Sequence, residues 1–116
     1  MFVRVLSASF GLSVQDPTWE QIKSAIQKLE WGEFSHSVFL GDGDTDGMTI
    51  ILRPPPAPRV YIVLVQRRAG FFGAYVPEDE VLRLVRPYAE RGELIPSPYW
   101  DGPLPPPGPI TAKQPG

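Results

Sequence analysis

The most regularly spaced chemical groups in the sequence are three aspartates, Asp42, Asp44 and Asp46, which alternate with small residues in the order D-G-D-T-D-G. This order matches the first half of a calcium-binding loop, in which alternate carboxylates coordinate the ion. The twelfth position of such a loop needs a bidentate glutamate, and Arg53 stands there instead. The sequence therefore favours an acidic hairpin turn over a metal site. We expect its carboxylates to contact a basic partner.

Other combinations of catalytic or metal-binding residues are missing from the sequence. His36 is the only histidine and the chain has no cysteine, so a catalytic triad and a zinc site both lack their partners. No serine stands in a G-x-S-x-G segment, and the glycine-rich stretches lack the spacing of a phosphate loop. We expect a protein that is not an enzyme and that carries no cofactor.

The C-terminal part of the chain carries the aromatic residues Phe71, Phe72, Tyr75, Tyr99 and Trp100. They exceed what one small core hides, so Phe72, Tyr75 and Trp100 are predicted to anchor a protein interface. Arg67 and Arg68 are followed by Phe71, Phe72 and Tyr75, and cations beside aromatics are used to bind single-stranded nucleic acids. The formal net charge is -2, however, which gives little attraction for phosphates. Nucleic acid binding is therefore the alternative and protein binding the favoured interpretation.

Length and composition predict a single small folded unit. The 116 residues are near the commonest domain size and allow one hydrophobic core. No stretch approaches the ~20 apolar residues of a membrane span, and no signal peptide is recognisable at the N-terminus. The absence of cysteine fits a reducing compartment. We therefore expect a cytoplasmic protein that does not contact a membrane.

The pattern of apolar residues predicts an α+β fold. Four segments rich in Val, Ile, Phe and Tyr, at residues 35–40, 48–53, 59–66 and 71–76, are separated by Gly, Asp or Pro clusters at hairpin intervals, which is typical of an antiparallel meander. A further strand at residues 2–7 precedes the first helix. Two amphipathic helices complete the fold, and the sheet is expected to have four to six strands. The domain is predicted to span residues 1–101, followed by a flexible Pro/Gly-rich tail at 102–116. The predicted strands are residues 2–7, 35–40, 48–53, 59–66 and 71–76.

The helix boundaries are predicted from capping residues. Asp16 and Pro17 are expected to open the first helix, and Gly32 to end it. The second helix is predicted to begin at Pro77 and to close by Gly92, with a kink or an early end at Pro87. Residues 11–15 are expected to be a loop. The apolar face of the first helix is formed by Trp19, Ile22, Ile26 and Leu29.

In their order along the chain these features resemble the small α+β immunity proteins of bacterial polymorphic toxin systems, and in particular the first-numbered immunity family. The correspondence spans about residues 15–101. It is carried by Pro17-x-Trp19 at the start of the first helix, the helix at 81–90 leading into Arg91-Gly92-Glu93-Leu94, and the terminal Tyr99-Trp100-Asp101.

The resemblance implies an antitoxin that binds a cognate toxin and occludes its active site, with no catalytic role of its own. Toxins of these systems include nucleases and deaminases that act on nucleic acids and present basic clefts. The acidic turn is therefore a candidate mimic of phosphate groups. Two alternatives remain: a phage or mobile-element accessory or inhibitor protein, and a module that binds single-stranded nucleic acid.

Overall fold

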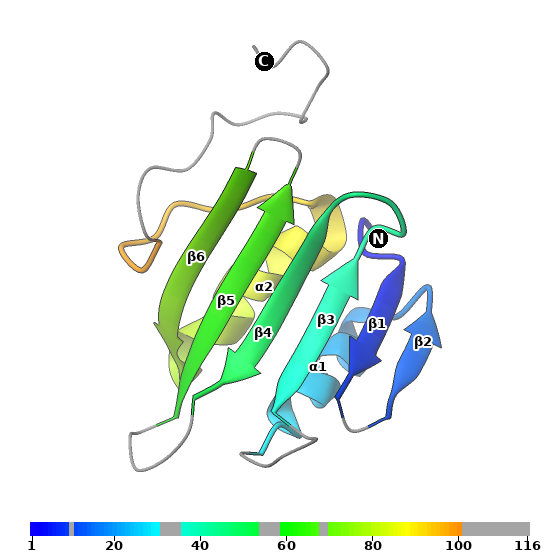
Figure 1. Ribbon diagram of the computed structural model, residues 1–116, viewed down its shortest axis with the longest axis horizontal. Coiled ribbons are helices and arrows are strands. Elements are labelled where there is room, and N and C mark those ends of the chain that lie inside the picture. Colours follow the sequence, from blue (N-terminus) through cyan, green and yellow to red (C-terminus); the bar gives the residue numbers. More distant parts are fainter. Residues whose placement is uncertain (10, 31–35, 54–58, 68–69, 101–116) are drawn as a thin grey trace, which may run out of the picture.

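Six antiparallel strands form one continuous sheet in the computed structural model (Figure 1). The structure describes residues 1–9, 11–30, 36–53, 59–67 and 70–100. The order across the sheet is β2-β1-β3-β4-β5-β6. The last four strands are neighbours in sequence and in space, so the predicted meander is confirmed. The strands are β1 (Val5–Ala8), β2 (Ser13–Gln15), β3 (Ser37–Gly41), β4 (Gly47–Leu52), β5 (Val60–Arg67) and β6 (Gly70–Pro77).

Two helices, α1 (Trp19–Gln27) and α2 (Glu78–Arg91), lie on the same side of the sheet (Figure 1). The strands send every second side chain toward them, because successive residues of a strand point to opposite faces. The α+β class, the antiparallel sheet and the two helices are as predicted. The core residues that the strands from β3 to β6 contribute are Val38, Leu40, Met48, Ile50, Leu52, Tyr61, Val63, Val65, Ala74 and Val76. In the described residues no helix is long and apolar enough to cross a membrane.

Strand β2 corrects the predicted loop at residues 11–15. Ser13–Gln15 pairs with β1 at the edge of the sheet. Gly11 has φ 98°, and the Ala8 amide donates to the carbonyl of Leu12 at 2.9 Å, which folds this segment back onto β1. A strand of three residues places a single side chain, Val14, on the helix side. Its sequence therefore shows no recognisable alternation.

The start of α1 also differs from the prediction. Thr18 is the N-cap and forms a reciprocal capping box with Gln21, so the helix begins two residues later than Asp16 suggested. Asp16 has φ 49° and its carboxylate lies 2.6 Å from Nε of Arg4. The helix ends at Gln27, before the predicted stop, which lies outside the described residues. Ile22, Ile26 and Leu29 are buried as expected.

Helix α2 continues through Pro87 to Arg91, so the early end predicted at this proline is wrong. A proline inside a helix removes one backbone hydrogen bond at a cost of about 3 kcal/mol. Leu84, Val85 and Tyr88, on either side of it, are fully buried. Burial of side chains of this size offsets the lost bond, since each contributes about 1.5–3 kcal/mol.

The end of α2 is closed by contacts from two directions. Gly92 has φ 71°, and its amide donates to the carbonyl of Tyr88 at 2.7 Å while the next amide reaches that of Pro87. The N-terminal segment also donates to this end, because the amides of Phe2 and Val3 bond the carbonyls of residues 90 and 89 at 3.0 Å. These bonds satisfy carbonyls that a helix end otherwise leaves without partners.

The segment that follows α2 docks on the edge of the sheet through Trp100. Trp100 forms an antiparallel bridge with Ala74 of β6, and its indole N–H donates to the carbonyl of Ile95 at 2.8 Å. Its side chain is buried. Asp101 and the tail predicted at 102–116 lie outside the described residues.

Substitution of Gly92 tests the closure of α2. A Cβ at this position would lie 2.8 Å from the ring of Phe2 in addition to the unfavourable positive φ. We expect Gly92→Ala to lower the free energy of unfolding in urea by about 2–3 kcal/mol. Gly11→Ala is the matched control, because φ is positive there but nothing lies within 4 Å. It should cost about 1 kcal/mol. Equal losses would show that the contact with Phe2 has no role.

Candidate protein-binding face

The face of the sheet opposite the helices, here called the open face, has no helix over it in the described residues, and Figure 1 looks onto it. Six large hydrophobic side chains are exposed in the described chain, and four of them stand at strand positions on this face. These four are called the aromatic patch. They are Phe39, 42% exposed, Leu64, 43% exposed, Phe71, 75% exposed, and Tyr75, 60% exposed.

The register of the strands places the patch residues close together. Phe39 and Leu64 occupy one row across the sheet, with Thr49 of β4 between them and Gly73 of β6 next in the row. Phe71 and Tyr75 stand two residues before and after Gly73 on the same strand. Exposed apolar side chains gathered on one face of a sheet typically mark an interaction surface.

Phe39 is held in place by two glycines. Gly41 is the last residue of β3 and pairs with Gly47, the first residue of β4. A Cβ on either residue would lie 2.8 Å from the ring of Phe39, so the ring rests on the bare backbone at this point. Aromatic side chains often cover glycines in sheets in this way. The patch therefore includes a ring whose position is fixed before any partner binds.

The charge on the open face is sparse. Arg53, directly after β4, places its guanidinium carbon 5.7 Å from the centre of the Tyr75 ring, within the range of a cation–π contact. The described strand positions that point to this face carry no acidic residue; toward β1 and β2 they are mainly Ser and Gln. The face is thus aromatic and aliphatic on β5 and β6 and polar toward β2.

The three aromatic residues predicted to anchor an interface have different environments. Tyr75 belongs to the aromatic patch. Phe72 is on the helix side and packs against the core, and Trp100 is 7% exposed. Phe39 and Leu64 were not among the predicted interface residues, and Phe71 was a candidate surface aromatic but not one of the three predicted anchors. Alternation gives the missing signal: Phe71 and Tyr75 share a parity on β6, while Phe72 shares the parity of the buried Ala74 and Val76.

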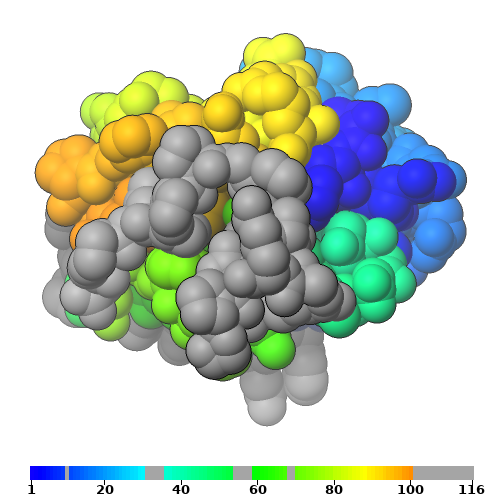
Figure 2. All heavy atoms as spheres, turned by 90° about the horizontal axis from the view of Figure 1, so that it is seen from above, coloured from blue at the N-terminus to red at the C-terminus, as the bar shows by residue number. Residues whose placement is uncertain are grey.

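The acidic turn between β3 and β4 is organised by Asp42. Its Oδ1 accepts hydrogen bonds from the amides of Asp44 at 2.8 Å and Asp46 at 3.2 Å, as in an Asx turn. Asp44 is exposed and Asp42 is half-buried. Figure 2 shows this end of the molecule, where the turn lies next to the N-terminal segment. Two of the three carboxylates therefore lie at or near the surface.

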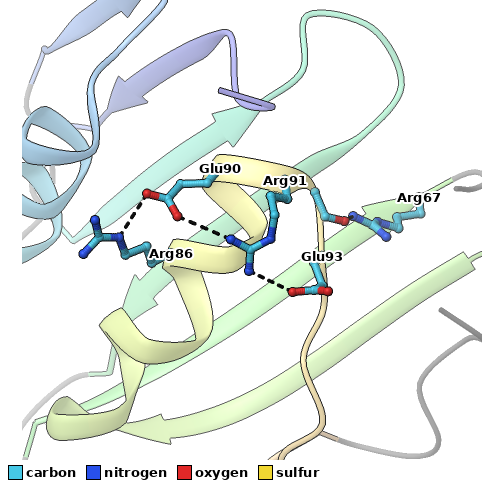
Figure 3. Close-up of polar contacts among 6 residues, drawn as sticks. Arg67, Arg86, Glu90, Arg91 and Glu93 are labelled. Carbon is cyan, nitrogen blue, oxygen red and sulfur yellow. Dashed lines mark hydrogen bonds and ion pairs between the residues drawn. The ribbon is translucent and has the colours of Figure 1, made fainter. Parts of the chain in front are cut away.

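Asp46 turns inward and takes part in a buried cluster. Its carboxylate is 12% exposed and lies 3.1 Å from Nε of Arg67, which is 7% exposed. The other carboxylate oxygen accepts the hydroxyl of Tyr88 at 2.7 Å. Arg67 also donates to the carbonyl of Gly92, and Figure 3 shows it reaching from β5 toward the end of α2. Asp46 therefore has structural partners within the fold.

The aromatic ring of Tyr88 completes this cluster. The guanidinium carbon of Arg67 lies 5.5 Å from the ring centre. Burial raises the pKa of the Tyr88 phenol well above its ordinary value, and the hydrogen bond to Asp46 raises it further. Tyr88 is therefore held neutral as a hydrogen-bond donor.

The arginine–aromatic segment that suggested nucleic acid binding is not a free cationic surface. Arg67 points to the helix side and is enclosed by its contacts with Asp46 and Tyr88. Arg68 lies outside the described residues. Within the described chain, no group of three or more His, Cys, Asp or Glu residues is placed to hold a metal ion.

On the helix side of the molecule lies a groove of about 470 Å³ between α1 and α2, lined in part by Trp19, Lys23 and Arg86. Arg86 lies over the Trp19 ring and pairs with Glu90, which in turn contacts Arg91 (Figure 3). Arg91 also pairs with Glu93 at 2.9 Å. The arginines that line this groove are already paired with carboxylates. The groove is therefore a weaker candidate for a binding site than the aromatic patch.

No protein-family model, curated protein or solved structure matches this chain.

Two substitutions distinguish the structural role of Asp46 from the surface position of Asp44. We expect Asp46→Ala to lower the free energy of unfolding by about 3–4 kcal/mol, because it leaves the charge of Arg67 buried without its partner. Asp44→Ala, the control in the same turn, should change stability by less than about 0.5 kcal/mol. Urea titration of both variants measures the difference. A mild effect of Asp46→Ala would contradict the buried ion pair.

The raised pKa of Tyr88 predicts a loss of stability in alkali. The phenol releases its proton near pH 10 in the unfolded chain but keeps it in the folded protein. Stability is therefore retained below pH 10 and falls as the pH rises above it, with a slope of about 1.4 kcal/mol per pH unit from this group. Tyr88→Phe should remove that contribution in urea titrations between about pH 9 and 11. Identical slopes in both proteins would contradict this assignment.

Proposed function

We propose that this protein is a non-enzymatic binding protein that uses the aromatic patch to occlude another protein. Specifically, we propose an immunity protein that neutralises a cognate bacterial toxin in the cytoplasm. The observation that carries the proposal is the clustering of Phe39, Leu64, Phe71 and Tyr75 on one uncovered face. The resemblance to immunity proteins supplies the class of partner.

The patch exposes apolar side-chain area to water. Complete burial of a side chain of this size contributes about 1.5–3 kcal/mol, so a partner that covers the patch gains several kcal/mol. The strands that carry the patch are paired along their lengths, and Phe39 is seated on two glycines. A rigid surface loses little conformational entropy on binding. The open face is therefore suited to tight association.

The acidic turn has a secondary role in this proposal. Gly41 and Gly47 join it to the strands beneath Phe39, so Asp42 and Asp44 lie next to the patch. Charges at the rim of an interface mainly raise the association rate and fix orientation. A toxin that acts on nucleic acid, such as a nuclease or deaminase, presents the basic surface that such a rim would attract. The proposal leaves Asp46 out of this role, because its carboxylate contacts Arg67 and Tyr88 within the fold.

The sequence is also compatible with two other functions. A phage or mobile-element inhibitor would use the same face, and only the identity of the partner distinguishes it from an immunity protein. Binding of single-stranded nucleic acid is less well supported, because Arg67, one of the two cations on which it depended, is enclosed.

The decisive experiment co-expresses the C-terminal domain of the neighbouring reading frame with this protein. We expect host survival and a 1:1 complex by size-exclusion chromatography. Phe71→Ser with Tyr75→Ser should weaken the complex by more than about 30-fold, since hot-spot residues each contribute about 2 kcal/mol or more. Tyr99→Ser is the matched control, because Tyr99 is also an exposed aromatic residue but is not one of the strand residues of the open face.

Three outcomes would count against the proposal. Toxicity without rescue would reject the immunity function for this pair. Host survival with the double variant would show that the interface lies outside the aromatic patch. Equal losses in the double variant and in Tyr99→Ser would show that the patch has no special role.

A further inference from the structure

We infer that the aromatic patch is a binding site for a proline-rich segment in the polyproline II conformation, and that its resident occupant is this chain's own segment 102–109. The inference rests on the proposed function and deepens it, because it names what covers the same face when the protein partner is absent. Its test needs no toxin, so its outcome is separate from that of the proposed function.

The backbone of the open face restricts what can bind there. In β3, β4 and β5 each strand is paired on both sides, so their amides and carbonyls are already used in the sheet. A ligand over this face must bind through side-chain contacts. A polyproline II segment suits such a surface, because it makes no hydrogen bonds within itself and loses little entropy on binding. Domains that recognise proline-rich ligands present aromatic side chains for this purpose.

The chain leaves the described residues beside the patch. Trp100 pairs with Ala74, the residue between Gly73 and Tyr75 on the edge strand β6. Because this bridge is antiparallel, the chain after Trp100 runs toward the beginning of β6, where Phe71 lies. The anchor is rigid, since the indole is buried and bonded to Ile95. The following segment therefore begins next to two of the four patch residues.

The length of chain after this anchor is sufficient to cover the patch. Sixteen residues follow Trp100 in the sequence, and in a polyproline II conformation they would span about 50 Å. The patch extends from β6 to β3, three strand spacings, which is about 14 Å. Residues 102–109 alone reach about 25 Å. The segment can thus leave the sheet edge, turn and cross the patch.

The composition of the segment matches the surface. It reads G-P-L-P-P-P-G-P, with five prolines, one leucine and no charge. Its carbonyls need donors, and the patch offers the phenol of Tyr75 and the guanidinium of Arg53, which are in contact with each other. The face presents no described acidic side chain that would lose its hydration under an apolar cover.

The proline-rich segment and the patch belong to the same chain, so even a weak contact between them is populated. A short tether gives the segment an effective concentration in the mM range at a nearby site. If the intrinsic dissociation constant is about 1 mM, the patch is covered for about half of the time. Removing the segment would then raise the affinity of the patch for another ligand about twofold. The segment therefore shields the apolar face and yields to a tighter partner.

The test uses the full chain with one spin label. Because the sequence has no cysteine, a Thr111→Cys variant carries a nitroxide at a single thiol. We expect paramagnetic relaxation of methyl signals on the open face to exceed that of buried methyl signals on the helices several-fold. The open-face probes are Ile51, Ile62 and Leu64, and the helix probes are Ile22, Ile26 and Leu84.

Two further variants assign the contact. Phe71→Ser with Tyr75→Ser should abolish the selective relaxation while leaving the methyl spectrum of the core unchanged. Alanine at Pro105, Pro106 and Pro107 should reduce it, whereas Lys113→Ala, the control in the same segment, should not. Uniform relaxation of the methyl groups of all six probe residues, or persistence of the selective relaxation in the double variant, would overturn the inference.

A mixed sample tests for a second copy as the occupant. Isotope-labelled chains without a nitroxide are mixed with unlabelled chains that carry it. Relaxation within this mixture would show that the segment or the face binds another molecule, and would overturn the intramolecular assignment. We expect none. Truncation after Asp101 should then raise the binding of a hydrophobic dye about twofold, and unchanged dye binding would contradict shielding.

Discussion

The buried contact between Asp46 and Arg67 ties the sheet to α2. Asp46 ends the turn after β3, Arg67 ends β5, and Tyr88 of α2 bonds the same carboxylate at 2.7 Å. Arg67 also donates to Gly92, which closes the helix. The Nε–H of Arg67 is not aligned for a hydrogen bond with Asp46, so their attraction is ionic. One small cluster therefore fixes the acidic turn, the β5 end and the helix end together.

Such a cluster specifies an arrangement more than it adds stability. Moving two charges out of water costs several kcal/mol for each, and a pair recovers this only if its remaining groups are satisfied. Here the carboxylate has two partners and the guanidinium meets a carboxylate, a carbonyl and an aromatic ring. Any displacement of the helix end would leave a buried charge without a partner. The consequence is that α2 has a defined position over the sheet.

This arrangement gives the two faces of the sheet different roles. Both helices cover one face, so residues of one parity form the core, and residues of the other parity remain free to contact other groups. We therefore expect substitution of a core residue to lower stability, and substitution of Phe71 or Tyr75 to act on the proposed binding instead. The face is polar near β2 and mainly apolar on β5 and β6.

The sequence by itself determined the α+β class, the meander from β3 to β6 and the buried face of α1, because hydrophobic periodicity and turn residues are local signals. It did not reveal β2, whose three residues show no period, or the capping of α1 by Thr18. Only the tertiary structure decided the site. Alternation sorts Phe71 from Phe72, but which parity faces solvent depends on the side that the helices cover. Asp46 and Asp44 look alike in sequence, and their difference arises because Arg67 and Tyr88, distant along the chain, converge on one of them.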